Sequence, residues 1–444
     1  MKTSKCRISG DKLTTVVDLG NLYVSNFCRD ATTACAKGPL VLGLGSKSGL
    51  LQLLEPVDPD LMYRQYWYRS GTNSTMRKQL ADIVNVIPNW IRLKNGDIVL
   101  DIGCNDGTLL SLYPAGPKII KVGIDPAANL ADEGRRHCDL HACDYFSKRA
   151  FSSLTAGSRA KVITSIAMFY DLDDPHGFVD DIVGCLADDG VWIVQASYTP
   201  LMLAQNAFDN ICHEHIEYYT LLSVEHLLRP HGLKIVDVEL NDTNSGSFRL
   251  TIARQTNELR QSNLFYKELG RYRFESLLSY EKVLRLNEPE VYMEFVRRIE
   301  RQKKTTMELL RDLRKQGKKI YGYGASTKGN TLLQYYGIGP DLITAIAERQ
   351  AQKVGLMTAG SWIPIISEEE MRAASPDFLF VLPWQFINEF CEREASFLKG
   401  GGKFIVPLPE LQIIGAGVGH PPVLAIEPKR SSRRAAESRS HIVR

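Results

Sequence analysis

Short apolar runs separated by amphipathic stretches fill the middle of the chain. They include residues 98–102, 121–124, 161–169 and 190–198, each bounded by charged or turn-forming residues. Continuous apolar runs of this length are typical of strands that are buried on both faces. Because these runs alternate with helical stretches, we expect a mostly parallel, doubly wound sheet. The pattern predicts a Rossmann-like core across residues 81–255.

A similar alternation returns near the C-terminus after a long helical region. Residues 256–317 are charged and carry apolar residues at three-to-four spacing, which predicts helices that connect two lobes. Strand-like runs resume in residues 318–415 and predict a second, smaller Rossmann-like lobe. Residues 1–80 are rich in turns and predict a small irregular module. The expected fold class is α/β with two Rossmann-like lobes, and the last part of the tail in residues 416–444 is predicted to be disordered.

Length and charge narrow the function classes. A chain of 444 residues is too long for one compact core and predicts two or three domains. The formal net charge is only +3, and basic residues are interleaved with acidic ones except at the C-terminus. A nucleic-acid binder would concentrate positive charge on one face, so we expect a small-molecule substrate and no nucleic-acid partner. None of these features predicts an oligomeric state.

The sequence shows neither a candidate membrane span nor an export signal. No run reaches eighteen apolar residues, and the N-terminal segment lacks the apolar centre of a signal peptide. We therefore expect no membrane partner and a cytoplasmic location. The nine cysteines lack paired spacing and are expected to be mostly buried thiols.

A glycine-rich turn follows the first strand of the predicted core. Gly103 and Gly107 allow the backbone to pass close to a ligand, and Asp101 precedes them. Such a turn suits a dinucleotide or S-adenosylmethionine, and a single one is equally compatible with a purely structural strand-to-helix turn. Asp125 ends the next strand and Asp144 follows the one after it. Glycines and acids at three successive strand ends favour cofactor binding.

This arrangement resembles that of class I methyltransferases. The resemblance implies S-adenosylmethionine as cofactor, with Asp125 on its ribose hydroxyls and Asp144 beside its adenine. The expected cofactor-binding residues are Asp101, Gly103, Asn105, Gly107, Asp125, Asp144, Tyr145 and Phe146.

Three consecutive titratable residues, His213, Glu214 and His215, follow the last strand of the core. Metal ligands on one helix are expected about four residues apart, so adjacent histidines fit a metal site poorly. A histidine beside a carboxylate suits proton abstraction next to a carbonyl, because imidazole titrates near neutrality. A lone histidine is more often a packed core residue. Here the neighbouring carboxylate and the position after a Rossmann-like strand favour a general base.

Four segments carry a more specific resemblance: YWYRSGT (66–72), ICHEHIEYY (211–219), NDTNSGSFR (241–249) and YGASTKGNTLL (323–333). Together they are similar to the sugar C-methyltransferases that act on nucleotide-linked 3-keto-6-deoxyhexoses. The likeness extends to about residue 415. It implies that His215 is the base, that Glu214 supports it, and that Tyr66 and Tyr68 line the substrate site. Methyl transfer would then proceed from an enolate to the sulfonium methyl group.

Donors to the enolate oxygen and contacts to the nucleotide are also expected. Tyrosine hydroxyls or Asn244 are candidates for the enolate oxygen, where charge develops. In the second lobe a helix N-terminus after a strand suits an anion, and Lys328 adds positive charge. The expected substrate-binding residues are Asn244, Ser326, Lys328, Asn330 and Glu348. The chain departs from the family pattern at Cys212, where a tyrosine is common, and at Phe169-Tyr170, where a histidine is common.

The N-terminal module of this family usually holds zinc through two Cys-x-x-Cys pairs. At the corresponding positions this chain has Cys6, Ser9, Gly45 and Ser48. Serine is a poor zinc ligand and glycine has no side chain, so we expect no metal there.

Several alternatives remain open from the sequence. The aromatic cluster Tyr63, Tyr66, Trp67 and Tyr68 is as compatible with a small core as with a substrate site. The second lobe is also compatible with a structural role alone. Transfer to oxygen or nitrogen would use the same His215 on a different proton. A non-catalytic, cofactor-binding scaffold is the third possibility.

Overall fold

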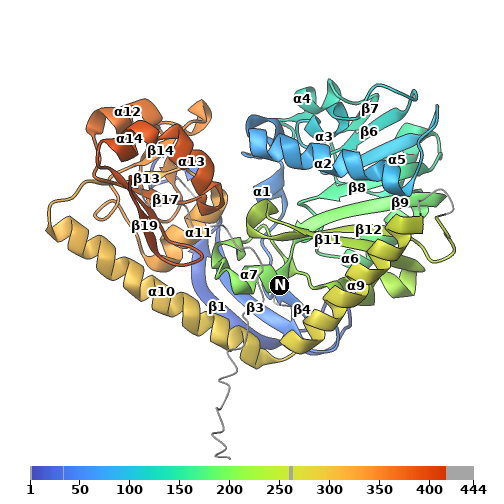
Figure 1. Ribbon diagram of the computed structural model, residues 1–444, viewed down its shortest axis with the longest axis horizontal. Coiled ribbons are helices and arrows are strands. Elements are labelled where there is room, and N and C mark those ends of the chain that lie inside the picture. The colour runs from blue at the N-terminus through green and yellow to red at the C-terminus, as the bar shows by residue number, and fades with distance from the viewer. Residues whose placement is uncertain (1–2, 34, 260–263, 417–444) are drawn as a thin grey trace, which may run out of the picture.

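The computed structural model of the chain describes residues 3–33, 35–259 and 264–416. The predicted disordered tail lies outside these residues. Figure 1 shows two α/β lobes side by side, with N-terminal strands beneath and between them. Each lobe and the N-terminal module contain a sheet of their own.

The first lobe is built on a seven-stranded sheet whose strands arise from the apolar runs. All five residues of β5 (Ile98–Ile102) are buried, as expected for a central parallel strand covered on both faces. Strands β7, β6, β5, β8 and β9 run parallel, and β12 is antiparallel to both β9 and β11. The sheet order is β11 (Leu233–Asn241), β12 (Ser247–Arg254), β9 (Leu186–Ser197), β8 (Ala160–Ile166), β5, β6 (Ile120–Ile124) and β7 (Leu140–Ala142).

Helices flank this sheet, and local capping explains where several begin. Asn73 accepts a hydrogen bond from the Thr75 amide at the start of α2, and Ser147 accepts one from Ala150 at the start of α5. The helices of this lobe are α2 (Ser74–Trp90), α3 (Thr108–Ser111), α4 (Ala131–Arg135), α5 (Lys148–Thr155), α6 (Pro175–Cys185), α7 (Thr199–Ala204) and α8 (Leu221–Leu228). Because the sheet is parallel, the carboxyl ends of β5, β6 and β8 meet at one edge, where ligands bind in such folds.

The N-terminal module is more regular than the turn-rich sequence suggested. Its antiparallel sheet has the order β1 (Thr14–Tyr23), β3 (Lys37–Gly45), β4 (Leu50–Leu53) and β10 (Glu217–Tyr218). The last strand comes from the segment that follows His215. Leucines on β3 and β4 are buried against partners from both lobes, so a regular sheet forms only when distant parts of the chain complete it.

The second lobe has a six-stranded, mostly parallel sheet. Its order is β16 (Ile365–Ser367), β14 (Ile346–Glu348), β13 (Ile320–Tyr323), β17 (Phe378–Val381), β18 (Lys403–Val406) and β19 (Gln412–Ile414), with β19 antiparallel. Four helices pack with it: α11 (Thr327–Tyr336), α12 (Glu368–Ala374), α13 (Ile387–Arg393) and α14 (Ala395–Lys399). The second Rossmann-like lobe expected from the sequence is present.

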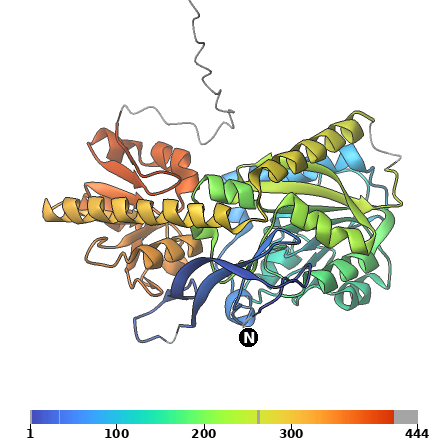
Figure 2. The same cartoon turned by 90° about the horizontal axis from the view of Figure 1, so that it is seen from below.

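Two long helices run between the lobes in sequence. Helix α9 (Leu264–Leu284) packs along β11, and α10 (Pro289–Lys315) packs along β1. Both views show α9 against the first lobe and α10 along the second (Figures 1 and 2). Buried residues of β1 and β3 share one apolar core with α10 and the second lobe, whereas Cys6, Ile8 and Leu50 belong to the core of the first. The N-terminal module thus packs against both lobes.

Candidate active site

The turn after β5 brings backbone close to the edge of the sheet. Gly103 has φ of +71°, and a side chain there would approach Met168 to 3.2 Å. The Gly103 amide donates to the Ile124 carbonyl at 2.8 Å, which ties the turn to β6. Asn105 follows in a left-handed conformation and donates from its side chain to the Tyr68 carbonyl at 3.1 Å. The turn therefore holds the aromatic segment beside it.

Asp125 stands at the end of β6, next to this turn. Its two carboxylate oxygens accept hydrogen bonds from the amides of Asn105 and Ala127, each at 2.8 Å. Burial raises the pKa of Asp125, and these two hydrogen bonds oppose that rise. Each carboxylate oxygen has a second lone pair, so Asp125 can still accept from the hydroxyls of a ribose.

Asp101 lies within β5 and supports the turn. Its Oδ1 accepts a hydrogen bond from the Thr164 hydroxyl at 2.6 Å. Burial raises the pKa of Asp101 to about 7, although the Thr164 hydrogen bond opposes the shift.

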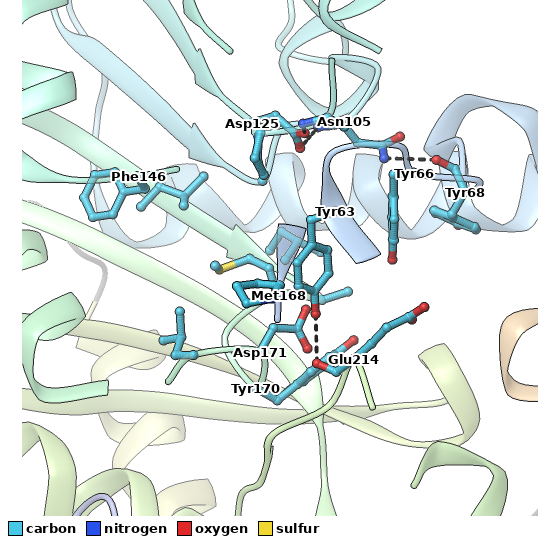
Figure 3. A pocket seen from close by; sticks show the side chains of 18 of the residues that line it. Tyr63, Tyr66, Tyr68, Asn105, Asp125, Phe146, Met168, Tyr170, Asp171 and Glu214 are labelled. Atoms are coloured by element: carbon cyan, nitrogen blue, oxygen red, sulfur yellow. Dashed lines mark hydrogen bonds between the residues drawn. The ribbon is translucent and has the colours of Figure 1, made fainter. Parts of the chain in front are cut away.

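A cavity of about 590 Å³ opens at this edge, in the size range of small-molecule sites. Among the residues predicted to bind the cofactor, six line it: Asp101, Gly103, Asn105, Asp125, Tyr145 and Phe146. The same cavity is lined by His215 and by Glu214, which Figure 3 shows. The structure therefore brings the glycine turn and the predicted base to one space.

Two predicted cofactor residues, Gly107 and Asp144, do not line this cavity. Gly107 has φ of +76° at the start of α3, and a Cβ there would lie 3.0 Å from the Gly134 carbonyl oxygen. Its role is the close packing of α3 on α4. Asp144 is exposed and accepts from the Tyr145 amide, because the chain turns outward after β7. The structure therefore gives no support to an adenine contact from Asp144.

The two histidines of the His-Glu-His segment have different surroundings. The His213 ring nitrogen Nε2 lies 3.0 Å from the Gly38 carbonyl, in the N-terminal module. The His215 Nδ1 lies 2.7 Å from the Asn210 carbonyl. A carbonyl only accepts, so Nδ1 of His215 carries the hydrogen and Nε2 is left to accept a proton. Only His215 combines a cavity position with a free acceptor nitrogen.

Burial acts in opposite directions on the adjacent imidazole and carboxyl. Burial, together with the positive charge of Lys328, lowers the pKa of His215 to about 3. It raises the pKa of Glu214 to about 7, which Lys328 opposes. The His215 imidazole is therefore uncharged at neutral pH, as a base must be before it acts. The Glu214 carboxyl, in contrast, changes its charge near pH 7.

The backbone of this segment is held from two sides. The Tyr170 carbonyl accepts from the amides of Ile216 and Glu217, at 2.8 and 2.9 Å. On the other side, β10 pairs with β4, and the Leu53 amide donates to the Ile216 carbonyl at 2.8 Å. The Tyr170 ring also meets the His215 ring edge-on, with centroids 4.4 Å apart. The N-terminal module and the loop after β8 together position His215.

The aromatic cluster serves two purposes. Trp67 packs edge-on against Phe27 and donates to the Asn26 side chain at 2.9 Å, as a core residue would. Tyr63, Tyr66 and Tyr68 line the cavity instead. The Tyr63 hydroxyl donates to the Glu214 carbonyl at 2.8 Å, as Figure 3 shows. The sequence singled out Tyr66 and Tyr68, and the same cluster would also have supplied Tyr63.

The second lobe contributes few of its predicted residues to the cavity. Lys328 lines it and donates to the Asn210 side chain and to the Asn244 carbonyl, and Asn244 lines it as well. Ser326, Asn330 and Glu348 do not. Ser326 caps α11, Asn330 donates to the Asn26 carbonyl at 2.8 Å, and Glu348 accepts from the Ala325 amide at 2.9 Å. These three side chains have structural partners.

The positions expected to have lost zinc ligands lie together. The Cys6 sulfur is 3.2 Å from the Ser48 hydroxyl and accepts from the Ser9 amide, and a Cβ on Gly45 would lie 2.7 Å from it. The Cys6 thiol is the single good zinc ligand among these four residues. In the active site, donor atoms of Cys212, Glu214 and His215 lie within 4.8 Å of one another. The nearby Lys328 ammonium disfavours a cation there.

Comparison with known proteins identifies the family. A family model of a methyltransferase domain matches residues 72–238, and one of a C-methyltransferase C-terminal domain matches residues 242–409. The C-methyltransferase NovU of Streptomyces niveus is 31% identical over 420 residues, covering 93% of this chain and 97% of that protein. This chain belongs to the C-methyltransferase family. It is an S-adenosylmethionine-dependent enzyme that methylates carbon, so the oxygen, nitrogen and scaffold alternatives are set aside.

Solved methyltransferase structures give partial overlaps. Magnesium protoporphyrin IX methyltransferase of Synechocystis PCC 6803 with bound S-adenosylmethionine is 13% identical, with a TM-score of 0.29, covering 40% of this chain and 78% of that one. The plantazolicin methyltransferase BpumL with S-adenosylhomocysteine is 14% identical, with a TM-score of 0.32, covering 40% of this chain and 84% of that one.

Within the described residues, no helix is both long and apolar enough to span a membrane.

Proposed function

We propose that this enzyme methylates carbon of a nucleotide-linked keto-deoxysugar, and that His215 forms the enolate. The observation that carries the proposal is that His215, with its free acceptor nitrogen, shares one cavity with the Gly103 turn and Asp125. The motif resemblance over residues 66–72, 211–219 and 323–333 supports the choice of substrate class.

The proposed chemistry begins with proton removal from the carbon next to the ketone. Nε2 of His215 takes the proton, and the electron pair of the broken C–H bond moves onto the carbonyl oxygen. The Asn210 carbonyl keeps the hydrogen of His215 on Nδ1, so Nε2 stays unprotonated until then. Ionised Glu214 then stabilises the imidazolium. When bound, S-adenosylmethionine would supply the electrophilic methyl group to the carbon nucleophile, and the electron pair of the broken C–S bond would stay on sulfur.

The remaining predicted residues receive roles from their positions. Asp101, Gly103, Asn105, Asp125, Tyr145 and Phe146 form the cofactor side of the cavity, and Tyr66, Tyr68 and Asn244 face the substrate. Lys328 is the positive charge that the second lobe brings to the cavity, so it is the proposed contact for the anionic nucleotide part. Ser326, Asn330 and Glu348 are not proposed as ligand contacts. A cavity of about 590 Å³ and a net charge of +3 support a small molecule rather than a nucleic acid as substrate.

Exchange of the substrate's α-proton in deuterated water tests this proposal without methyl transfer. The wild-type enzyme is expected to exchange the proton of a keto-deoxysugar nucleotide when no cofactor is present. His215→Asn is expected to lower exchange and turnover by about 10²–10⁴-fold, the usual contribution of a general base. The affinity for S-adenosylmethionine should stay unchanged, since His215 is not proposed to hold it.

His213→Asn is the matched control for this variant. His213 is also buried and also bound to a backbone carbonyl, but it lies outside the cavity lining. It is expected to retain exchange. Equal exchange by the wild type and His215→Asn would contradict the assignment of the base, and no exchange by the wild type would contradict the substrate class.

A further inference from the structure

Asp171 is a cavity-lining carboxyl to which no role has so far been given. It lies in the loop between β8 and α6, directly after Tyr170. The Tyr170 carbonyl is fixed by the amides of Ile216 and Glu217, and its ring packs on His215. Asp171 is therefore held beside the proposed base by the same loop that positions it.

One oxygen of the Asp171 carboxyl lacks the hydrogen-bond partner that a buried charge needs. This atom, Oδ1, is buried and has no hydrogen-bond partner in the part of the chain that the structure describes. Among the described residues, sixteen buried side-chain nitrogen and oxygen atoms have no hydrogen-bond partner. Of these sixteen atoms, only Oδ1 of Asp171 belongs to a residue that lines the cavity. An unpaired, buried carboxylate is costly, so the neutral acid is the favoured form.

The electrostatic surroundings favour the same protonated form. Burial raises the pKa of Asp171 well above its ordinary value, and the neighbouring charge of Glu214 raises it further. The hydroxyl of Tyr63 opposes this shift only in part. Figure 3 shows Asp171 beneath Tyr63 and beside Glu214.

We propose that Asp171, as a neutral acid, donates a hydrogen bond to the carbonyl oxygen that becomes the enolate oxygen. The inference rests on the proposed function above. It gives the enzyme a second catalytic residue, which touches the substrate on the oxygen while His215 acts on the carbon. The proton stays on Asp171 throughout, shared more strongly with the oxygen as negative charge develops there.

Geometry and chemistry both favour Asp171 for this role. The oxygen is bonded to the neighbour of the carbon that loses its proton, so it must lie near His215. The Tyr63 hydroxyl already donates to the Glu214 carbonyl, and the Lys328 ammonium, two of whose hydrogens go to Asn210 and Asn244, is the proposed contact for the nucleotide part. Carboxylic acids that an apolar site keeps neutral are known donors to enolate oxygens. An ionised carboxylate in the same place would repel the enolate.

The proposal is tested by α-proton exchange in deuterated water with two Asp171 variants. Asp171→Leu has a similar branched shape and no donor, and it is expected to lower exchange by about 10²–10³-fold. Asp171→Asn keeps an N–H donor and is expected to retain clearly more exchange than Asp171→Leu. Both should bind S-adenosylmethionine as the wild type does. Asp174→Asn, on the same loop, is the matched control, because asparagine also caps α6 and Asp174 does not line the cavity.

The outcomes separate this inference from the proposed function. If the wild type shows no exchange with any keto-sugar nucleotide, the proposed function fails. If the wild type exchanges and Asp171→Leu exchanges equally fast, Asp171 is not the donor. If Asp171→Leu loses cofactor binding through misfolding, Asp171→Ala replaces it, because the smaller side chain cannot clash. Wild-type exchange by that folded variant would overturn the inference in the same way.

Discussion

The two lobes contain nearly the same strand-turn-helix unit. In the first lobe the Gly103 amide donates to the Ile124 carbonyl, and in the second the Gly324 amide donates to the Ala347 carbonyl, both at 2.8 Å. The two glycines have φ of +71° and +81°. The acid at the end of the next strand accepts from the turn in both cases: Asp125 from Asn105 at 2.8 Å, and Glu348 from Ala325 at 2.9 Å.

What differs is the space in front of each acid. Asp125 borders the 590 Å³ cavity. Glu348 is enclosed: its Oε1 accepts from the amides of Arg349 and Gln350, and Lys353 lies 3.8 Å from its Oε2. The Lys353 ammonium also donates to the Ala325 carbonyl at 2.8 Å. The glycine turn and its acid therefore form a stable backbone unit, which becomes a ligand site only where neighbouring segments leave room.

Among the variants that test this comparison, the largest effect is expected from exchanging each acid for its amide. Asp125→Asn should weaken S-adenosylmethionine binding by about 10–100-fold, because hydrogen bonds to a charged group are each worth about 1.5–3 kcal/mol. Glu348→Gln should leave that affinity unchanged. The variants are well matched, because each places an amide NH₂ against a backbone N–H of the turn. Isothermal titration with cofactor measures the difference, and equal losses in both variants would break the comparison.

The pH dependence of turnover tests the role of Glu214 in the first lobe. The pKa of Glu214 is raised to about 7, so its carboxylate form is lost as pH falls below that value. If the carboxylate supports His215, turnover should fall about tenfold for each unit below pH 7. Glu214→Gln should have lower turnover at every pH, and its turnover should not show this fall below pH 7.

Asp101 titrates near the same pH, so cofactor affinity must be measured alongside turnover. If cofactor affinity is constant over this pH range, the fall in turnover is assigned to Glu214. If the same fall in turnover persists in Glu214→Gln, another group causes it.

Lys328 tests whether the second lobe takes part in substrate binding. Lys328→Met should raise KM for the nucleotide-linked substrate about tenfold, the cost of one charged hydrogen bond. Lys328→Arg should recover part of that loss, since it restores the charge. Steady-state kinetics gives both values, and the cofactor KM is the internal control. If Lys328→Met leaves the KM for the nucleotide-linked substrate unchanged, the second lobe has a structural role only.

The smallest effect on activity is expected for Lys353, whose side chain fills the glycine turn of the second lobe. Lys353→Met removes the hydrogen bond to the Ala325 carbonyl and the nearby charge for Glu348, which should cost about 1–3 kcal/mol of stability. Thermal unfolding should show a midpoint a few degrees lower, with unchanged cofactor affinity. Lys399→Met, at an exposed position of helix α14, is the control. A midpoint equal to that of the control would mean that Lys353 does not stabilise the turn.

The apolar pattern was sufficient for the main architecture and for part of the site. Buried runs such as residues 98–102 and 320–323 predicted both lobes, because a strand covered on two faces must be apolar along its length. Gly103, Asp125 and His215 were recognisable because a turn, a strand end and an adjacent carboxylate are local features. The N-terminal sheet was not, since its fourth strand comes from residues 217–218.

Only the tertiary structure decided which local features face the cavity. It left His213 and Asp144 outside and brought Tyr63, Asp171 and Lys328 to one place from three distant segments. It also distinguished two almost identical glycine turns, by filling one with Lys353. The physical reason is that sequence patterns record backbone conformation and burial, whereas an open cavity depends on how side chains from distant segments pack around it.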